Sequence, residues 1–281
     1  MKLAGIVILY YPNTEIVIEH IRSYSSSLEK MFIYDNTENP DQAFIDLIKK
    51  VEGNISYIST GTNEGIAKRL NEASHKARQE GYEFLLTMDQ DSSFKPGDFK
   101  KYISLIQSSN NSNVAQFGVN HQPDFTPAKE LPEEALALIT SGSILNLSLT
   151  DKVGVFNEDF FIDFVDTEFS FRVIQNGYIN LMFSNIELNH SLGTLIEGRS
   201  LVSFKKSKRI IHSPIRVFYI VRNGLYLLFK AKGLSTFMKQ EVIRSIKIIK
   251  NDLIYHPQLI AVYKNLFLGV YYYIVNRMGK K

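Results

Sequence analysis

The chain has 281 residues, of which 44% are apolar and 22% are charged. This composition is that of a globular protein and excludes a disordered or collagen-like chain. The length is near the upper end for one domain, so we expect one domain with an extension. The absence of cysteine excludes disulfides and cysteine nucleophiles, so any metal is held by carboxylate, imidazole or backbone oxygen.

The net charge of +3 conceals an uneven distribution along the chain. Residues 1–200 contain 16 basic and 27 acidic residues, which gives a net charge of −11. Residues 201–281 contain 16 basic residues and only Glu241 and Asp252 as acids, which gives +14. A basic and aromatic C-terminal part favours an anionic partner, either nucleic acid or an anionic membrane surface.

The apolar N-terminal run Leu3–Leu9 is too short for a signal peptide and lacks a cleavage-site pattern. The sequence also contains no apolar run long enough to predict a transmembrane helix. We therefore expect a cytoplasmic protein that contacts the inner face of the cell membrane peripherally.

The first half of the chain alternates apolar strand segments with amphipathic helical segments. Strands are predicted at 3–9, 31–34, 55–59, 84–88 and 114–119. Helices are predicted over roughly 13–28, 41–51 and 65–81, and after Pro96. This alternation predicts an α/β fold with a mostly parallel sheet and helices on both faces. Ligands of such sheets bind outside the carboxyl ends of the strands.

The second half predicts a strand, a turn and a strand over 136–147, followed by a helix from about 167 to 176. Two further strands are predicted at 179–183 and 186–190, and helices at roughly 213–231, 235–254 and 258–276. We therefore expect a domain at 1–200 and a basic, aromatic helical extension at 201–281.

Two aspartates, Asp89 and Asp91, directly follow a buried predicted strand. Carboxylates so close together are costly to hold without a cation, and Mg²⁺ or Mn²⁺ prefers oxygen ligands. An ordinary aspartate-rich turn is the alternative interpretation. His190 follows the predicted strand 186–188 and is a candidate third ligand, with a purely structural histidine as its alternative.

Other strand ends and helix starts carry polar side chains with two interpretations each. Asp35 suits a nucleobase imide or a ribose hydroxyl, or it simply forms a turn. Asn63-Glu64-Gly65 begins a helix that carries Lys68 and Arg69. This helix start either binds a phosphate group or is an ordinary capped helix with a solvated face. Asp166, between Asp163 and Glu168, suits a general base or a helix cap.

Several common catalytic patterns are missing from the sequence. It contains no GxGxxG and no GxxxxGK[ST], which argues against a dinucleotide-binding fold and a P-loop NTPase. It contains no GxSxG, and Ser141-Gly142-Ser143 has no base nearby in the sequence, so we predict no nucleophilic serine.

Ordered motifs resemble the inverting family 2 glycosyltransferases of GT-A fold, and among them the bacterial rhamnosyltransferases. The motifs span roughly residues 3–225. They are Tyr10-Tyr11-Pro12, Tyr34-Asp35-Asn36-Thr37, Asn63-Glu64-Gly65-Ile66-Ala67, Leu86-Thr87-Met88-Asp89-Gln90-Asp91-Ser92, Ile162-Asp163-Phe164-Val165-Asp166-Thr167-Glu168, Asn189-His190-Ser191-Leu192-Gly193 and Arg216-x-x-Tyr219-x-x-Arg222-Asn223.

The resemblance implies transfer of L-rhamnose from dTDP-L-rhamnose to a hydroxyl of a lipid-linked or cell-surface polysaccharide. It implies Asp166 as the catalytic base and Asp91 and His190 as ligands of Mg²⁺ or Mn²⁺. The nucleotide-sugar site that it implies comprises Tyr10, Asp35, Asn63, Gly65, Lys68, Asp89, Gln90 and Arg222. Inverting transfer needs one base and no covalent intermediate, which agrees with one separate acid beside the aspartate pair.

Two other functions compete with this one. The first is a family 2 enzyme with a UDP-sugar donor, and the second is a nucleic-acid-binding module built on the basic C-terminal region. The basic residues there alternate with aliphatic and aromatic ones, so we expect no nucleic acid. Residues 259–274 instead predict a helix with an apolar stripe, which contacts an anionic membrane, the chain's own domain or a second copy of the chain.

Overall fold

The structure is a computed structural model that describes residues 1–109, 112–122, 126–190, 193–199 and 206–281. It divides into two compact units. The sheet unit comprises residues 1–158 and 166–190, and the helical unit comprises residues 159–165 and 191–281. The domain boundary predicted at residues 200 and 201 lies outside the described residues.

The sheet unit is built on a sheet of nine strands in the order β3-β2-β1-β4-β8-β6-β9-β5, with β7 also paired to β9. The strands are β1 (Leu3–Leu9), β2 (Lys30–Asp35), β3 (Ile55–Ser59), β4 (Phe84–Asp89), β5 (Ser93–Phe94), β6 (Val114–Asn120), β7 (Glu133–Glu134), β8 (Ser143–Asn146) and β9 (Ile179–Asn189). β1, β2, β3 and β4 are parallel, as the alternating pattern predicts.

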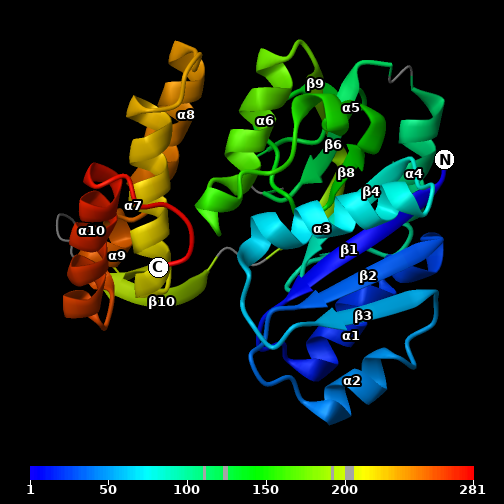
Figure 1. Cartoon of the computed structure of the whole chain (residues 1–281), viewed down its shortest axis with the longest axis horizontal. Coiled ribbons are helices and arrows are strands. Elements are labelled where there is room, and N and C mark those ends of the chain that lie inside the picture. The colour runs from blue at the N-terminus through cyan, green and yellow to red at the C-terminus, as the bar shows by residue number, and fades with distance from the viewer. Residues whose placement is uncertain (110–111, 123–125, 191–192, 200–205) are drawn as a thin grey trace. The chain divides into compact units, whose positions relative to one another are not determined.

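Six helices cover this sheet: α1 (Thr14–Arg22), α2 (Gln42–Ile48), α3 (Gly65–Gln79), α4 (Asp98–Ser108), α5 (Leu147–Val153) and α6 (Val165–Gln175). Asn13 begins α1 because its side chain accepts a hydrogen bond from the amide of Ile16, and Asp41 caps α2 in the same way. Figure 1 shows α3 lying across β1 and β4.

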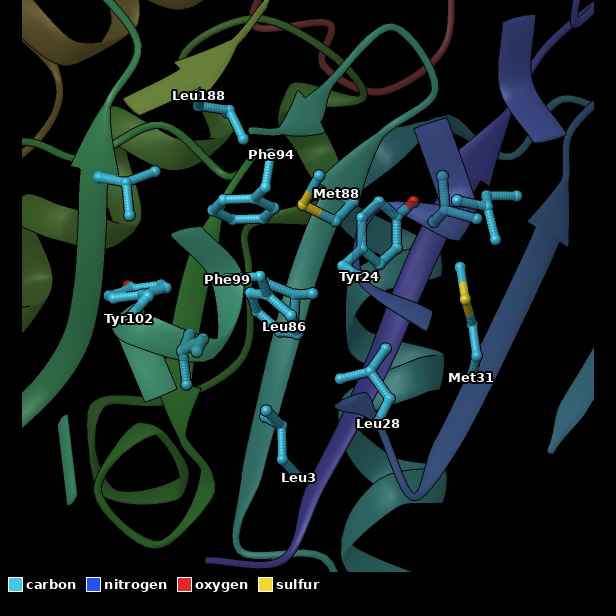
Figure 2. Packing of buried hydrophobic residues seen from close by; sticks show 14 of the residues in the cluster. Leu3, Tyr24, Leu28, Met31, Leu86, Met88, Phe94, Phe99, Tyr102 and Leu188 are labelled. Carbon is cyan, nitrogen blue, oxygen red and sulfur yellow. The ribbon is translucent and has the colours of Figure 1, made fainter. Parts of the chain in front are cut away.

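The main hydrophobic core joins the sheet to α1, α2 and α4. Alternate residues of each strand enter it, for example Leu86 and Met88 of β4, because successive strand side chains point to opposite faces. Figure 2 shows Phe94, Phe99 and Tyr102 packed beside these strand residues, and the ring centroids of Phe94 and Phe99 lie 4.9 Å apart. This core fixes the strands whose ends carry the candidate site.

The described residues of the helical unit form an antiparallel hairpin and four α-helices. The hairpin is formed by β10 (Thr194–Arg199) and β11 (Lys206–Ile211), and the helices are α7 (Pro214–Phe229), α8 (Thr236–Lys247), α9 (Lys250–Tyr255) and α10 (Leu259–Ile274). α7 and α10 lie side by side (Figure 1). Among the described residues, no helix has the length and apolar character needed to cross a membrane.

Several predicted elements differ from those observed. α1 ends at Arg22 instead of near residue 28, because the Ser23 hydroxyl donates to the carbonyl of His20 and a 3-10 turn follows. Only 143–146 of the segment 136–147 is a strand, and 179–189 forms one strand instead of two. The helix predicted over 235–254 is divided between α8 and α9, and the hairpin before α7 was not predicted.

Candidate active site

The sheet topology brings the ends of several strands to one edge. β8 runs antiparallel to both β4 and β6, so β6 is parallel to β4, and β9 is parallel to β6. The chain therefore leaves β1, β2, β3, β4, β6 and β9 at the same side of the sheet, which we name the carboxyl edge. In parallel sheets this is the edge that binds ligands.

Asp89, Asp91 and His190 meet at the carboxyl edge. Asp89 ends β4 and His190 follows β9, while Ser93 of β5 pairs with Asn189 and so holds Asp91 beside His190. One ligand atom from each of the three side chains lies within 4.8 Å of the other two. The structure thus brings together the three residues that the sequence offers as metal ligands.

The charges of this cluster favour an ionised carboxylate. The Nδ1 atom of His190 lies 3.3 Å from Oδ1 of Asp91 and 2.8 Å from the hydroxyl of Ser92. Burial raises the pKa of the Asp91 carboxyl, but the hydrogen bond and charge of His190, together with hydrogen bonds from the Asp91 backbone and the Ser92 side chain, hold that pKa below its usual value. Two carboxylates and an imidazole form a donor set that fits a divalent cation such as Mg²⁺ or Mn²⁺.

Gln90 fixes the loop that follows β1. Its side-chain oxygen accepts a hydrogen bond from the Tyr10 amide at 2.8 Å, and its side-chain nitrogen donates to the Tyr10 carbonyl at 3.2 Å. His20 donates from Nδ1 to the Gln90 carbonyl at 3.0 Å. The ring of Tyr10 is exposed and meets Tyr11 edge to face, with centroids 4.8 Å apart. Gln90 therefore holds the backbone of Tyr10 and leaves its ring accessible.

Asp35 is fully buried at the end of β2. Its Oδ2 accepts a hydrogen bond from the Tyr57 hydroxyl at 2.7 Å, and its Oδ1 accepts one from the Thr37 amide at 2.8 Å. Burial, and then the hydrogen bond to Asp35, raise the pKa of the Tyr57 hydroxyl. The Thr37 bond is the turn-forming contact of the alternative interpretation, and contact of Asp35 with a nucleotide stays a prediction.

The start of α3 carries Lys68, whose side chain is 41% exposed. Gly65 adopts φ +79°, which favours glycine, and its amide donates to the side chain of Asn63 at 3.0 Å. Lys68 lies 2.7 Å from Glu64, and this hydrogen bond raises the pKa of Lys68. Arg69 is buried and bonds to Asn36 at 2.8 Å, among other partners. Lys68 is therefore the accessible basic residue of this pair.

The predicted base, Asp166, lies in the first turn of α6. Its Oδ1 accepts a hydrogen bond from the amide of Thr167 at 2.7 Å. Glu168 forms an ion pair with Arg172 at 2.6 Å, and Asp163 is paired with an arginine in the helical unit. Protonation of Asp163 or Glu168 would break the ion pair of that carboxylate.

A strained segment of the helical unit precedes α6. Phe161, Asp163 and Phe164 all have φ between +61° and +64°, a region that non-glycine residues rarely adopt. The side-chain nitrogen of Asn223 donates to the carbonyls of Phe160, Ile162 and Asp163 at 2.9 to 3.0 Å. These bonds compensate the strain, which costs of order 1–3 kcal/mol per residue.

Arg222 belongs to the same clamp. Its side chain is 0% exposed, and its guanidinium donates to the carbonyls of Gly279, Asp159 and Phe160. Burial lowers the pKa of Arg222 to about 10. These contacts give Arg222 a structural role within the helical unit, and its predicted contact with the diphosphate stays a prediction. Arg216 forms the ion pair with Asp163, at 2.5 Å.

His121 was not identified from the sequence, although it follows β6 at the carboxyl edge. Its ring centroid lies 6.4 Å from that of His190. Burial, and then the charge of His190, lower the pKa of His121 to about 4, so it is neutral near pH 7. Its position after a buried strand is the same signal that identified Asp35 and Asp89. Ser141, whose hydroxyl accepts from the Asp89 amide at 3.1 Å, was missed for lack of any such signal.

Comparisons with known proteins identify the family of the chain. Residues 10–162 match the family described as glycosyl transferase family 2, so the chain belongs to that family. It is 25% identical over 289 residues to a protein of Shigella flexneri named dTDP-rhamnosyl transferase RfbF, and the match covers 94% of this chain and 90% of that protein.

Solved structures establish the fold class. A GalNAc-T7 crystal structure with UDP, GalNAc and Mn²⁺ is similar with a TM-score of 0.59 and 10% identity, over 92% of this chain and 58% of that one. Residues 1–349 of S. aureus TarS in complex with UDP-GlcNAc give a TM-score of 0.56 and 16% identity, over 96% and 81%. The predicted GT-A class, with its mostly parallel sheet, is confirmed.

Proposed function

We propose that this glycosyltransferase transfers L-rhamnose from dTDP-L-rhamnose to a hydroxyl of a lipid-linked or cell-surface polysaccharide acceptor. The observation that carries the proposal is the cluster of Asp89, Asp91 and His190 at the carboxyl edge of a family 2 fold. Rhamnose is supported by the name of the Shigella relative, which matches along almost the whole chain. We place the reaction on the cytoplasmic side of the membrane.

In this proposal Asp91 and His190 hold Mg²⁺ or Mn²⁺, with Asp89 nearer to the ribose and the sugar. The bound cation supplies positive charge where the nucleotide diphosphate leaves. The half-buried Lys68 at the start of α3, which is paired with Glu64, adds charge for the same phosphates. The exposed ring of Tyr10 offers a face on which a nucleobase stacks.

Asp166 acts as the base of an inverting transfer. It removes the proton from the acceptor hydroxyl while the C–O bond of the sugar to the diphosphate breaks and the bond to the acceptor oxygen forms. A single base on the face opposite the leaving group inverts the anomeric centre without a covalent intermediate.

A UDP-sugar is the alternative donor, because both structural neighbours were solved with UDP or a UDP-sugar. A thermal-shift screen of dTDP, UDP and GDP, each with and without Mn²⁺, separates the two, since a ligand that binds the folded state raises the unfolding temperature. We expect the largest rise in unfolding temperature with dTDP and Mn²⁺. In a separate activity assay, we expect release of dTDP from dTDP-L-rhamnose when acceptor is added. A larger shift with UDP would favour the alternative donor, and no shift with any nucleotide would contradict the proposal.

A further inference from the structure

α10 has one face that packs inside the helical unit. Val262, Asn265 and Gly269 are buried on this face. A Cβ atom at Gly269 would lie 2.7 Å from the carbonyl of Phe218 on α7, so glycine is what allows the two helices to approach. Val262 is 0% exposed.

The opposite face of α10 carries a different set of large apolar side chains, which we name the α10 stripe. Its members follow one another at intervals of three or four residues and so lie along one side of the helix. Ile260 is 88% exposed, and Phe267 and Ile274 are each 68% exposed. Contiguous apolar surface of this kind marks an interaction site. The stripe consists of Ile260, Tyr263, Phe267, Tyr271 and Ile274.

The C-terminal part of the chain that carries the α10 stripe is strongly basic, with a net charge of +14 over residues 201–281. Lys264 and Arg277 are exposed on or just after α10. Of the two acids in residues 201–281, Asp252 is fully buried against His212, and Glu241 is paired with Arg244 on α8. An apolar stripe flanked by basic residues is complementary to a surface that has anionic groups on the outside and apolar groups below them.

We infer that the α10 stripe lies on an anionic lipid bilayer. A second copy that met this face through its own residues 201–281 would bring another +14 of charge against it, which opposes such self-association. Nucleic acid would pair with the basic residues but would leave the aliphatic side chains without a partner. In a bilayer interface the stripe enters the acyl boundary while the basic residues meet the headgroups.

This inference does not depend on the donor sugar or on the catalytic residues. If the proposed function also holds, docking through α10 brings the enzyme to the surface where a lipid-linked acceptor is embedded. Because the stripe residues are exposed, their replacement by serine leaves the contact between α10 and α7 intact.

The test is cosedimentation of the full chain with vesicles of phosphatidylglycerol and phosphatidylcholine, or of phosphatidylcholine alone, at low and high salt. We expect binding only to the anionic vesicles, weakened by salt. The double variant Phe267→Ser/Ile274→Ser should bind them roughly tenfold more weakly or worse, given the transfer free energy of two large side chains. Ile260→Ser should show a smaller loss in the same direction.

The matched control is Leu131→Ser/Val155→Ser, which removes two apolar side chains of the sheet unit that are 77% and 62% exposed. It should bind vesicles like the wild type, and all variants should keep the wild-type circular dichroism and unfolding temperature. The inference is overturned if the wild type ignores anionic vesicles or if the stripe variant binds as well as the control. A dimer that becomes monomeric in the stripe variant, without loss of vesicle binding, would assign the face to self-association instead.

Discussion

The carboxyl edge of the sheet unit and the strained segment of the helical unit place polar groups by opposite means. At the carboxyl edge, backbone pairing positions the side chains, because β4, β6 and β9 end on the same side and carry Asp89, His121 and His190 there. In the strained segment, side chains position the backbone, since Asn223 and Arg222 bind a run of carbonyls. The first arrangement depends on topology and the second on a few individual hydrogen bonds.

This difference predicts how substitutions in the two regions behave. Side chains at the carboxyl edge can be replaced at the cost of chemistry, because the strands keep their register without them. Replacement of the clamp residues removes what holds an unfavourable backbone conformation, so stability suffers first.

Asp166→Asn tests the chemistry proposed for the start of α6 and has the largest expected effect. Asparagine can still accept the hydrogen bond from the Thr167 amide, but it cannot take a proton. Turnover should fall by about 10²–10⁴-fold, while nucleotide affinity and the unfolding temperature stay at wild-type values. Asp151→Asn, on the exposed side of α5, serves as the control and should keep full turnover. Near wild-type turnover in Asp166→Asn would show that the base lies elsewhere.

Asn223→Ala tests the structural side. The carbonyls of Ile162 and Asp163 lose the Asn223 donor, and that of Phe160 keeps its bonds from Arg222 and the Ile162 amide, so the free energy of unfolding should fall by about 1–3 kcal/mol, measured by urea denaturation. Asn251→Ala removes a single 3.2 Å bond to the carbonyl of Ile210 and should cost less than about 1 kcal/mol. Equal losses in the two variants would mean that the clamp does not stabilise the strained segment.

Tyr57→Phe sharpens the comparison within the sheet unit, with a smaller effect. It removes a donor from the buried Asp35 carboxylate and should cost about 1–2 kcal/mol in the same measurement. Tyr24→Phe is the matched control, because the buried Tyr24 hydroxyl has no hydrogen-bond partner among the described residues. That variant should be neutral or gain up to about 1 kcal/mol. A loss in Tyr24→Phe as large as that in Tyr57→Phe would show that the Asp35 bond contributes nothing specific.

Much of the carboxyl edge could be predicted from the sequence. The strand 3–9 was bounded correctly, because a buried parallel strand is a continuous apolar run. The strand 55–59 was also bounded correctly, although its residues are half-buried and include two serines. The parallel rule then places the residues after β4 and β9 together without knowledge of any contact. His121 satisfies the same rule and was missed only because its strand end was not considered.

The strained segment could not be predicted, because its local sequence gives no indication of it. Left-handed backbone is usually signalled by glycine, but here Phe161, Asp163 and Phe164 adopt it. The Asn223 side chain that stabilises them lies about sixty residues further along the chain. The hairpin of β10 and β11 was missed for a related reason, since its exposed strands lack the apolar alternation that predicts a half-buried strand.

The central claim is that Asp89, Asp91 and His190 bind a divalent cation on which donor binding depends. It is tested most directly by calorimetric titration of dTDP, with UDP in parallel, into the wild type and Asp91→Asn, each with Mn²⁺ or with EDTA. We expect Mn²⁺ to tighten nucleotide binding to the wild type by about tenfold or more, and not to change the Kd of Asp91→Asn, which should match the wild type in EDTA. Equal Mn²⁺-dependent tightening in Asp91→Asn, or none in the wild type, would contradict the claim.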